Sequence, residues 1–414
     1  MYNILYISKT FLKTAKNYIS RPIYLNRISP FIGQNLIKVL IGQRRVGKSY
    51  LMLQLMDMIL EKEPNAPILY INKELHEFES IHNHTSLNKY LADHIKPNTR
   101  NYIFIDEIQD ISGFEKSLRS LQAKGEYDIY ITGSNAFLLS GELATYLSGR
   151  YIEFKIFGLT YSEFLNFRNV DDSSVIFFQY LKFGGLPYLV NLELKDELVF
   201  DYLRNIYAAI LFKDVVARHS IRNISLLENL VRYLADNIGS LLSAKSVSDF
   251  LKTQKISVSP NVILNYLSFL EEAFFIWKVN RTELRGKKIF EIGQKYYLED
   301  LGLRHALLGY RTTDIAKILE NIVYLHLRVA GYEVHVGKYL DKEIDFVCQR
   351  GNEKLYIQVA YLLADERTIK REFGNLELIA DNYPKYVLSL DEQSLGNRNG
   401  IEHRHVRDFL RNLV

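Results

Sequence analysis

The sequence feature that most constrains this chain is a glycine-rich segment between an apolar run and a helical pattern. Residues 38–41 (KVLI) are mostly apolar, residues 42–49 read G-x-x-x-x-G-K-S, and residues 50–60 show helical periodicity. Gly42 and Gly47 can adopt backbone angles that are closed to other residues, so that successive N–H groups of the loop point toward an anion. The helix N-terminus that follows adds positive potential. This strand–loop–helix context predicts a phosphate-binding loop for a nucleoside triphosphate.

Two side chains of this loop have predicted tasks toward ATP and Mg²⁺, which we expect as the cofactors. Lys48 can bridge the β- and γ-phosphates, and Ser49 can offer its hydroxyl to Mg²⁺ as a metal ligand. The residues predicted to contact the nucleotide are Gly42, Gln43, Arg44, Arg45, Val46, Gly47, Lys48, Ser49 and Tyr50.

An acidic pair follows a second apolar run in the segment NYIFIDEIQ, residues 101–109. Residues 102–105 predict a buried strand, and Asp106 and Glu107 stand where that strand ends. Paired acids after a strand also occur on ordinary surfaces, but the phosphate-binding loop upstream favours a catalytic interpretation. We expect Asp106 to hold the Mg²⁺ ion with its waters and Glu107 to polarise the attacking water.

Polar residues at the end of the next predicted strand, residues 127–131, are candidates for contact with the γ-phosphate or the attacking water. Asn135 is the first choice and Ser134 the second. The alternative is that these side chains cap the helix that follows, and the two interpretations do not exclude each other.

Arg150 directly precedes another predicted strand, residues 151–156. We expect it to act catalytically, as a finger on the γ-phosphate that a neighbouring subunit binds, which would require a homo-oligomer. The alternative is a surface charge that interacts favourably with the C-terminus of the preceding helix.

Composition limits the classes of protein to which the chain can belong. Its 414 residues predict two to three domains, and 48% apolar with 24% charged residues is typical of a globular protein. The single cysteine, Cys348, excludes an intramolecular disulfide, and no run reaches the roughly 18 apolar residues that a membrane span needs. We therefore expect a cytoplasmic protein without a membrane segment. The formal net charge of +4 is too small to indicate nucleic-acid binding by itself.

The strand pattern gives way to amphipathic helices after Leu159, at residues 161–167, 175–183 and 197–212. Before the last of these lies the turn Gly185-Leu186-Pro187. This turn can lay its backbone against the adenine of the nucleotide, with Pro187 in contact, or it can be a plain helix break.

Residues 226–295 follow the element order of a winged helix. The predicted helices are residues 226–234, 246–252 and 260–272, and two strand-like pieces follow at residues 274–280 and 287–292. The basic residues of this predicted hairpin are Lys278, Arg281, Arg285, Lys287 and Lys288. They are candidates for DNA contact, although such modules also serve only as packing elements.

The chain from about residue 302 has the pattern of a further α/β unit. A helix at residues 315–329 precedes strands at 333–336, 343–347 and 355–359, a helix at 365–378 and a strand at 385–388. This order is typical of the restriction-endonuclease-like fold. Its carboxylates Glu320, Glu343 and Asp345 are candidates for a second metal site, because a cation relieves the repulsion between them.

The strand at residues 355–359 departs from the nuclease pattern. It should read Glu-x-Lys at its end, but this chain has Gln358 and Ala360. Glutamine is a poorer metal ligand than glutamate, and alanine cannot act on water, so we expect this region to bind without cutting DNA.

Nine motifs occur along the chain in a fixed order: IGQRRVGKSYL, YIFIDEIQ, ITGSNAFLLS, LSGRYIEFKIFGLTYSEF, KFGGLPYLV, KYYLEDLGLR, ILENIVYLHL, KEIDF and YIQVAY. In this order they resemble the AAA-superfamily ATPases of bacteria and archaea that carry a C-terminal domain of unknown function. The resemblance spans nearly the whole chain. It implies Lys48 and Ser49 as the P-loop pair, Asp106 and Glu107 as the Walker B pair, Asn135 as the sensor and Arg150 as the finger. The turn ending in Pro187 is similar to the nucleotide-contacting turn of signal-transducing ATPases.

We therefore predict an α/β fold that begins with a P-loop AAA-type module built on a parallel sheet. The predicted domains are residues 1–159 (ATPase core), 160–222 (helical lid), 223–300 (winged helix) and 301–414 (endonuclease-like, catalytically degenerate). The expected function is ATP hydrolysis that acts as a DNA-associated switch. The alternatives are an ATP-regulated nuclease and a nucleotide-dependent protein-binding scaffold.

Overall fold

The computed structural model describes residues 18–136, 147, 149–284 and 289–413. These residues form two compact units, Met1–Ile156 and Phe157–Val414. Most of the helix predicted after Asn135 lies outside the described residues, and so do three of the predicted DNA contacts, Arg285, Lys287 and Lys288. Within the described part of the chain, no helix combines the length and the apolar character that a membrane crossing requires.

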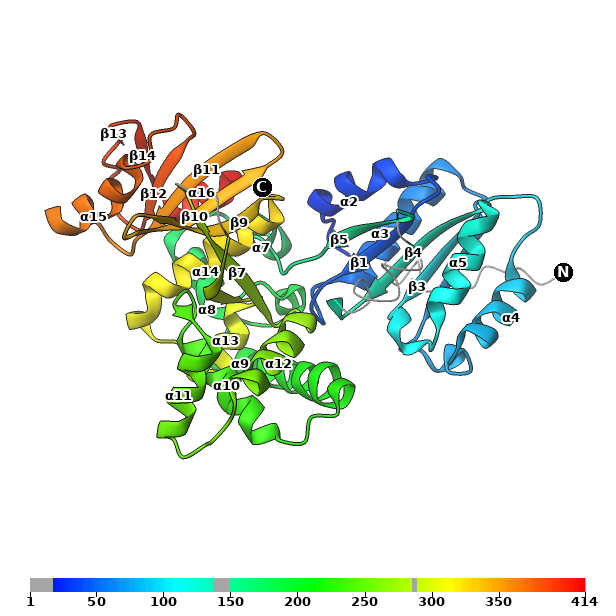
Figure 1. Ribbon diagram of the computed structural model, residues 1–414. Coiled ribbons are helices and arrows are strands. Elements are labelled where there is room, and N and C mark those ends of the chain that lie inside the picture. Colours follow the sequence, from blue (N-terminus) through cyan, green and yellow to red (C-terminus); the bar gives the residue numbers. More distant parts are fainter. Residues whose placement is uncertain (1–17, 137–146, 148, 285–288, 414) are drawn as a thin grey trace. The chain divides into compact units, whose positions relative to one another are not determined.

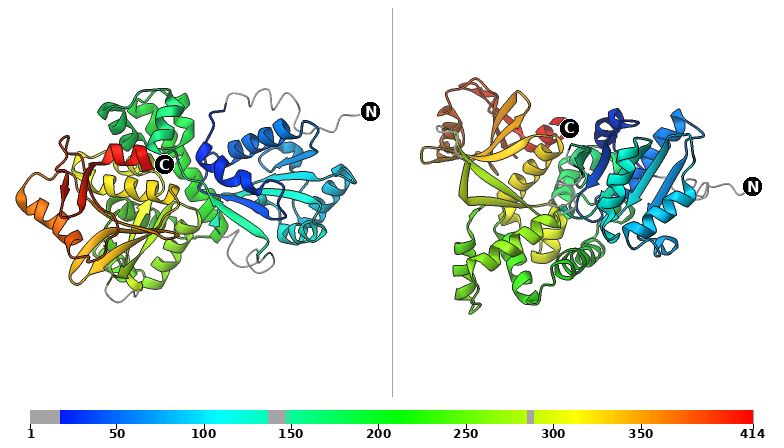
Figure 2. Two further views of the ribbon diagram at one scale, coloured as in Figure 1. Left: turned by 90° about the horizontal axis from the view of Figure 1, so that it is seen from above. Right: turned by 45° about the vertical axis from the view of Figure 1, so that its right-hand side comes forward.

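The first unit is built on a parallel sheet with the strand order β2-β3-β4-β1-β5 (Figure 1). The strands are β1 (Ile37–Ile41), β2 (Ile68–Asn72), β3 (Asn101–Asp106), β4 (Tyr127–Gly133) and β5 (Tyr151–Lys155). β1 and β3 are buried at every position, as expected for parallel strands that are covered on both faces. Figure 2 shows these strands, coloured blue to green, as one twisted sheet with helices packed alongside. The predicted parallel α/β module is confirmed.

Of the helices that the structure describes in this unit, one precedes the first strand and three connect successive strands. They are α2 (Pro22–Ile28), α3 (Lys48–Lys62), α4 (His84–His94) and α5 (Phe114–Lys124). α4 begins with a capping box, in which Asn83 accepts a hydrogen bond from the backbone N–H of Ser86 and the Ser86 hydroxyl accepts one from the backbone N–H of Asn83. α3 begins directly after the glycine-rich loop, at Lys48.

β4 lies between β1 and β3 in this sheet. The register pairs Ile41 with Gly133, and Ile105 with Ile131. The carboxyl ends of the three strands therefore meet at one edge, which is where open α/β sheets place their ligands.

A buried ion pair joins β1 to β4 toward the opposite edge of the sheet. The Lys38 ammonium donates to the Asp128 carboxylate, and both side chains are almost fully buried. Asp128 also accepts hydrogen bonds from the Gly33 backbone N–H (2.7 Å) and the Tyr130 hydroxyl (2.9 Å), while Lys38 donates to the Gln34 carbonyl (2.9 Å). Every charged atom of the pair thus has a partner, which is the condition under which buried charges are tolerated.

The second unit begins with helices. They are α7 (Tyr161–Arg168), α8 (Ser174–Phe183), α9 (Asp196–Ala209), α10 (Ile224–Asp236), α11 (Ala244–Thr253), α12 (Pro260–Glu272), α13 (Leu301–Leu308), α14 (Ile315–Val329), α15 (Glu366–Glu377) and α16 (Val406–Leu413). A π-helical segment, Ile210–Ala217, continues α9. α12 has Ser259 as its N-cap and Pro260 in its first turn.

A nine-stranded mixed sheet runs through this unit in the order β13-β14-β12-β11-β10-β9-β7-β8-β6. Its strands are β6 (Leu241–Leu242), β7 (Ile276–Glu283), β8 (Ile289–Leu298), β9 (Glu333–Tyr339), β10 (Lys342–Arg350), β11 (Glu353–Val359), β12 (Lys385–Ser389), β13 (Asn397–Arg398) and β14 (Ile401–His405). β7 and β9 pair in parallel, so the hairpin β7–β8 and the C-terminal strands belong to one sheet. The finer boundaries at residues 222 and 300 stay predictions.

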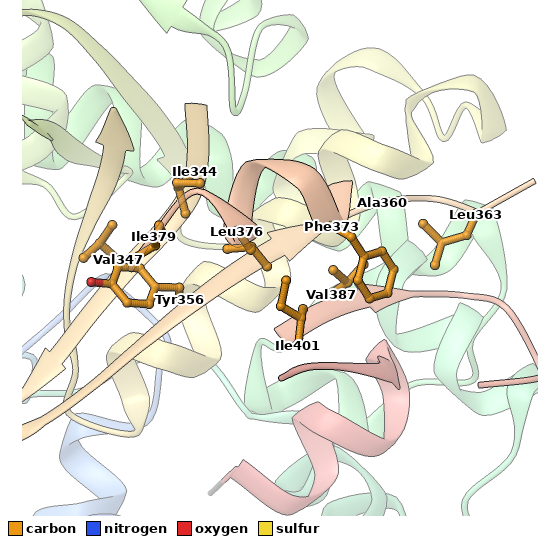
Figure 3. Close-up of a cluster of buried hydrophobic side chains, with 10 residues drawn as sticks. All are labelled: Ile344, Val347, Tyr356, Ala360, Leu363, Phe373, Leu376, Ile379, Val387 and Ile401. Carbon is orange, nitrogen blue, oxygen red and sulfur yellow. The ribbon is translucent and has the colours of Figure 1, made fainter. Parts of the chain in front are cut away.

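A cluster of buried apolar side chains holds α15 against the C-terminal strands (Figure 3). Phe373 and Leu376 of α15 pack with Tyr356 of β11, Val387 of β12 and Ile401 of β14. Ala360, which stands where the nuclease pattern has a lysine, is a buried member of this cluster. Position 360 therefore contributes to packing.

We expect Asp128→Asn to lower the free energy of unfolding of the first unit by about 3–5 kcal/mol, because the buried Lys38 ammonium then lacks its counter-charge. Denaturant unfolding followed by circular dichroism measures the change. Asp93→Asn, on the exposed face of α4, is the matched control and should stay within about 0.5 kcal/mol of the unchanged protein. Equal effects of the two substitutions would contradict this assignment.

Candidate functional site

The glycine-rich loop has the backbone geometry that phosphate binding requires. Gly47 has φ 96°, and Arg45 has φ 72°, so the loop alternates right- and left-handed backbone. A Cβ at Gly42 would lie 2.1 Å from the carbonyl oxygen of Ile156, which leaves glycine as the residue that fits. The loop then leads directly into the N-terminus of α3.

The Lys48 side chain lies under the loop and is 4% exposed. Its ammonium donates to the carbonyl oxygens of Gly42 (2.9 Å) and Gln43 (3.0 Å). It also lies 3.0 Å from the Ser134 hydroxyl, which comes from the end of β4. The ammonium is therefore held at the point where the loop and the adjacent strand meet.

Asp106 lies at the end of β3 and is 1% exposed. It accepts hydrogen bonds from the hydroxyls of Ser49, Thr132 and Tyr70, the last at 3.2 Å. Burial raises the pKa of this carboxyl, and the hydrogen bonds from Ser49 and Thr132 oppose that rise. The two residues that were predicted to bind Mg²⁺, Ser49 and Asp106, are therefore direct neighbours.

Glu107 follows in the left-handed region, with φ 56°, and its backbone N–H donates to the Thr132 hydroxyl (3.0 Å). Its carboxylate accepts from the Ser134 hydroxyl (2.8 Å) and from the Gln109 amide. Burial by itself would raise the pKa of Glu107. The charge of Lys48 and the hydrogen bonds from Gln109 and Ser134 outweigh burial, so the pKa is lowered and the carboxylate is ionised.

Ser134 connects the two ends of this arrangement, because its hydroxyl contacts both the Lys48 ammonium and the Glu107 carboxylate. Asn135 is next to it and fully buried. The order of preference between Asn135 and Ser134 as the sensor stays a prediction. Sequence reasoning missed Thr132, although a hydroxyl at the end of a buried strand is the available signal.

The predicted cofactor residues around the loop differ in their surroundings. Arg44 is mostly buried and lies 3.4 Å from Glu74, whereas Arg45 is exposed. Tyr50 is 59% exposed on the first turn of α3. Arg21 lies against the loop as well: its guanidinium donates to the Val46 carbonyl (2.9 Å).

Arg150 lies at the edge of the sheet that is remote from the loop. Its carbonyl accepts from the backbone N–H of Ile37, the first residue of β1, and its side chain is exposed. β1 is five residues long, so the two edges are about 13 Å apart at about 3.3 Å per residue. The backbone of Arg150 thus lies at the opposite edge of the sheet from the loop of its own chain.

The turn with Pro187 belongs to the second unit and is held by a buried carboxylate. Asp300 accepts a hydrogen bond from the Gly185 N–H (2.8 Å) and caps α13 through the Leu303 N–H (2.9 Å). A Cβ at Gly184 would lie 2.5 Å from the same carboxylate. Burial raises the pKa of Asp300 to about 6, although the backbone hydrogen bonds that it accepts lower the pKa. The role of Pro187 toward the nucleotide stays a prediction.

Two of the predicted DNA contacts lie on β7. Lys278 is exposed, and Arg281 is half-buried where β7 pairs with Val336 of β9. The Lys278 side chain is therefore exposed to solvent, whereas Arg281 lies beside the neighbouring strand β9.

The three carboxylates of the predicted second metal site do come together, but around a lysine. The Lys295 ammonium of β8 lies 2.7 Å from Glu320, 2.8 Å from Glu343 and 3.6 Å from Asp345. Burial and the charge of Glu320 raise the pKa of Asp345 to about 8. Across the residues that the structure describes, no group of three or more His, Cys, Asp or Glu side chains is arranged to hold a metal ion. Lys295 was missed because it is distant in sequence from all three acids.

The residues at the edge of the first sheet fit ATP with Mg²⁺. Glycine at position 42 lets the loop pack against the Ile156 carbonyl, glycine at position 47 has a positive φ, and Lys48 supplies a cation beneath the loop. Ser49 and Asp106 supply the hydroxyl and carboxylate oxygens that Mg²⁺ prefers. The bound ion would neutralise the charge of the phosphate oxygens.

Comparison with known proteins agrees with this geometry. Residues 34–165 match the family described as AAA domain, and residues 175–314 match a domain of unknown function. A Walker-type ATPase of Pyrococcus abyssi has a similar structure, with a TM-score of 0.52 and 15% identity over 71% of this chain and 97% of its own. That likeness shows a shared fold.

Two relatives align along most of their length. An uncharacterized protein of Haemophilus influenzae is 36% identical over 402 residues, which cover 96% of this chain and 99% of the relative. An uncharacterized protein of Methanocaldococcus jannaschii is 33% identical over 383 residues, which cover 87% and 83%. The chain belongs to the family that these two proteins represent, and its residues 34–165 match an AAA domain.

Proposed function

We propose that this protein binds ATP with Mg²⁺ and hydrolyses it, and that nucleotide state controls the position of the second unit. The observation that carries the proposal is the Ser134 hydroxyl, which contacts the Lys48 ammonium at 3.0 Å and the Glu107 carboxylate at 2.8 Å. The Lys48 ammonium, proposed to bind phosphate, and the Glu107 carboxylate, proposed as the base, are thereby held on either side of one hydroxyl. This arrangement places the two groups where a terminal phosphate and its attacking water could lie between them.

The proposed division of labour follows from the contacts of each residue. Lys48 and the loop N–H groups bind the β- and γ-phosphates, while Ser49 and Asp106 hold Mg²⁺. Glu107 accepts the proton of the attacking water, and Asn135 or Ser134 orients that water or the γ-phosphate. Arg150 acts on the site of a neighbouring subunit, since its own loop is at the opposite edge of the sheet.

The contacts within the second unit support transmission of a nucleotide signal. Asp172, which lies between two of the helices proposed as the lid, links them to the C-terminal helix α16 through hydrogen bonds. This carboxylate accepts from the Tyr161 hydroxyl (2.6 Å) and from Arg411 (2.7 Å). The Ser162 hydroxyl also donates to the Arg411 carbonyl (2.9 Å). A movement of residues 160–222 would therefore carry the C-terminal residues with it, as a rigid-body change.

The proposed partner is DNA, bound by a winged helix at residues 223–300 and by an endonuclease-like region at 301–414. Its support is the helix–hairpin element order of α10 to β8 and the exposed Lys278 on β7. A nucleotide-dependent protein-binding scaffold is the alternative that the same surfaces allow.

We expect Lys48→Ala to weaken ATP binding by about 10- to 100-fold, because it removes a charged hydrogen-bond donor to phosphate. Glu107→Gln should keep ATP affinity and lower turnover by about 10²- to 10⁴-fold, because the amide cannot accept a proton. Fluorescent-nucleotide binding and phosphate release measure the two effects.

Lys89→Ala and Glu79→Gln, both exposed in the first unit, are the matched controls for these substitutions. Hydrolysis by Glu107→Gln at the unchanged rate would remove Glu107 from its proposed role.

Arg150→Ala should lower turnover without loss of ATP affinity, and only at concentrations where the protein is oligomeric. Because a finger acts on a neighbour, a mixture of Arg150→Ala and Lys48→Ala subunits should regain part of the activity that each lacks. Arg119→Ala, another exposed arginine of this unit, should leave turnover unchanged. No recovery on mixing would leave Arg150 as a surface charge.

Duplex DNA should bind with salt-sensitive affinity and raise ATP turnover. Lys278→Glu should weaken binding to all sequences about equally and reduce the slope of log affinity against log salt concentration by about one. Fluorescence anisotropy over a salt series measures this, with exposed Lys370→Glu as the control. Absence of binding at low salt would favour the protein-binding scaffold.

A further inference from the structure

The carboxylates Glu320, Glu343 and Asp345 come from α14 and β10 and surround one ammonium group from β8. We call these three acids and Lys295 the Lys295 cluster. A restriction-endonuclease-like fold would place a divalent cation between such acids. Whether a metal ion fits depends on the distances within the cluster and on the other partners of each acid.

The distances suit an ammonium group. Its N–O separations are 2.7, 2.8 and 3.6 Å, while the oxygen ligands of Mg²⁺ or Ca²⁺ would have to converge to about 2.0–2.6 Å. Lys295 is 4% exposed, so its charge is held inside the protein at the centre of the acids. It thus stands where an ion would have to bind.

The acids of the cluster also have partners other than Lys295. The Tyr297 hydroxyl donates to the same Glu320 oxygen as Lys295 does, at 2.6 Å. The second oxygen of Asp345 accepts from the Val359 N–H at 2.9 Å. Glu343 is 33% exposed, so water stabilises the charge that one lysine leaves uncompensated. Lys295, the Tyr297 hydroxyl, the Val359 N–H and water thus share the stabilisation of the three acids.

Gln358 stands where a nuclease would have a metal-binding glutamate, and both ends of its amide are hydrogen-bonded within the protein. Its amide oxygen accepts from the Asp345 N–H (2.8 Å), and its amide nitrogen donates to the Glu372 carboxylate (2.8 Å). Glu372 is buried, and its other oxygen accepts from Arg371. A glutamate at position 358 would bring two carboxylates together, so glutamine is matched to this packing.

We propose that Lys295 takes the place of a divalent cation, so that the Lys295 cluster is an internal ionic link and not a metal centre. The link joins β8, the second strand of the hairpin, to α14 and β10 of the C-terminal region. Gly239, at the end of α10, assists by leaving room for the Glu320 carboxylate: a Cβ there would lie 3.0 Å from it. The hairpin and the C-terminal strands are thereby held together by charge as well as by the pairing of β7 with β9.

The function of this link follows from the elements that it joins. The hairpin and the C-terminal strands cannot separate without exposing a buried lysine and its acids. A partner that binds the hairpin therefore meets the C-terminal surface in a fixed orientation. This inference concerns the second unit alone and does not depend on ATP hydrolysis.

Removal of the lysine should convert the link into a cation site. We expect Lys295→Ala, as the nucleotide-free full chain, to lower the melting temperature by about 5–10 °C, because the acids lose their counter-charge. Mn²⁺ should restore at least half of that loss in Lys295→Ala and leave the unchanged protein unaffected. The double variant Lys295→Ala/Asp345→Asn should gain no stability from Mn²⁺, and exposed Lys370→Ala is the control.

Two results would overturn the proposal. One is Lys295→Ala with an unchanged melting temperature. The other is stoichiometric Mn²⁺ binding to the unchanged protein that Asp345→Asn abolishes, since the ion would then bind with the lysine in place. Isothermal titration of Mn²⁺ into the unchanged protein and into Asp345→Asn gives an answer even if Lys295→Ala fails to fold. Absence of Mn²⁺ binding to the unchanged protein supports the link.

Discussion

The insertion of β4 between β1 and β3 is the constraint on which the candidate site depends. It places the Ser134 hydroxyl between the loop lysine and Glu107, and the Thr132 hydroxyl against the acidic pair. Three charged groups are buried there together, and such groups are tolerated only when each one has a partner. Ser134 serves Lys48 and Glu107 at once, while Thr132 donates to Asp106 and accepts from the Glu107 N–H.

The same contacts separate the two acids chemically. Asp106 is almost fully buried, and burial prevails, so its pKa is raised. At Glu107 the charge of Lys48 and two hydrogen bonds prevail over burial, so its pKa is lowered. Two residues that are adjacent in the sequence therefore have pKa values shifted in opposite directions by their surroundings.

Each unit also uses a buried lysine as an internal cation. Lys38 joins two neighbouring strands through a single carboxylate, whereas Lys295 joins a hairpin strand to a helix and a further strand through three. In both places the buried ammonium is paired with carboxylates, and removal of such a partner would leave a buried charge uncompensated. These lysines tie together elements that are far apart in the chain.

Local patterns in the sequence determined a large part of this protein. The phosphate-binding loop, the acidic pair and helices such as α12 and α14 were predicted, because they depend on neighbouring residues, caps and short-range periodicity. β14 and α16 were not predicted; they are only five and eight residues long. Strand order, the bridging role of Ser134 and the presence of Lys295 among the acids were decided by the tertiary structure. Each of them joins residues that are distant in the chain, and a single sequence carries no local signal for such pairings.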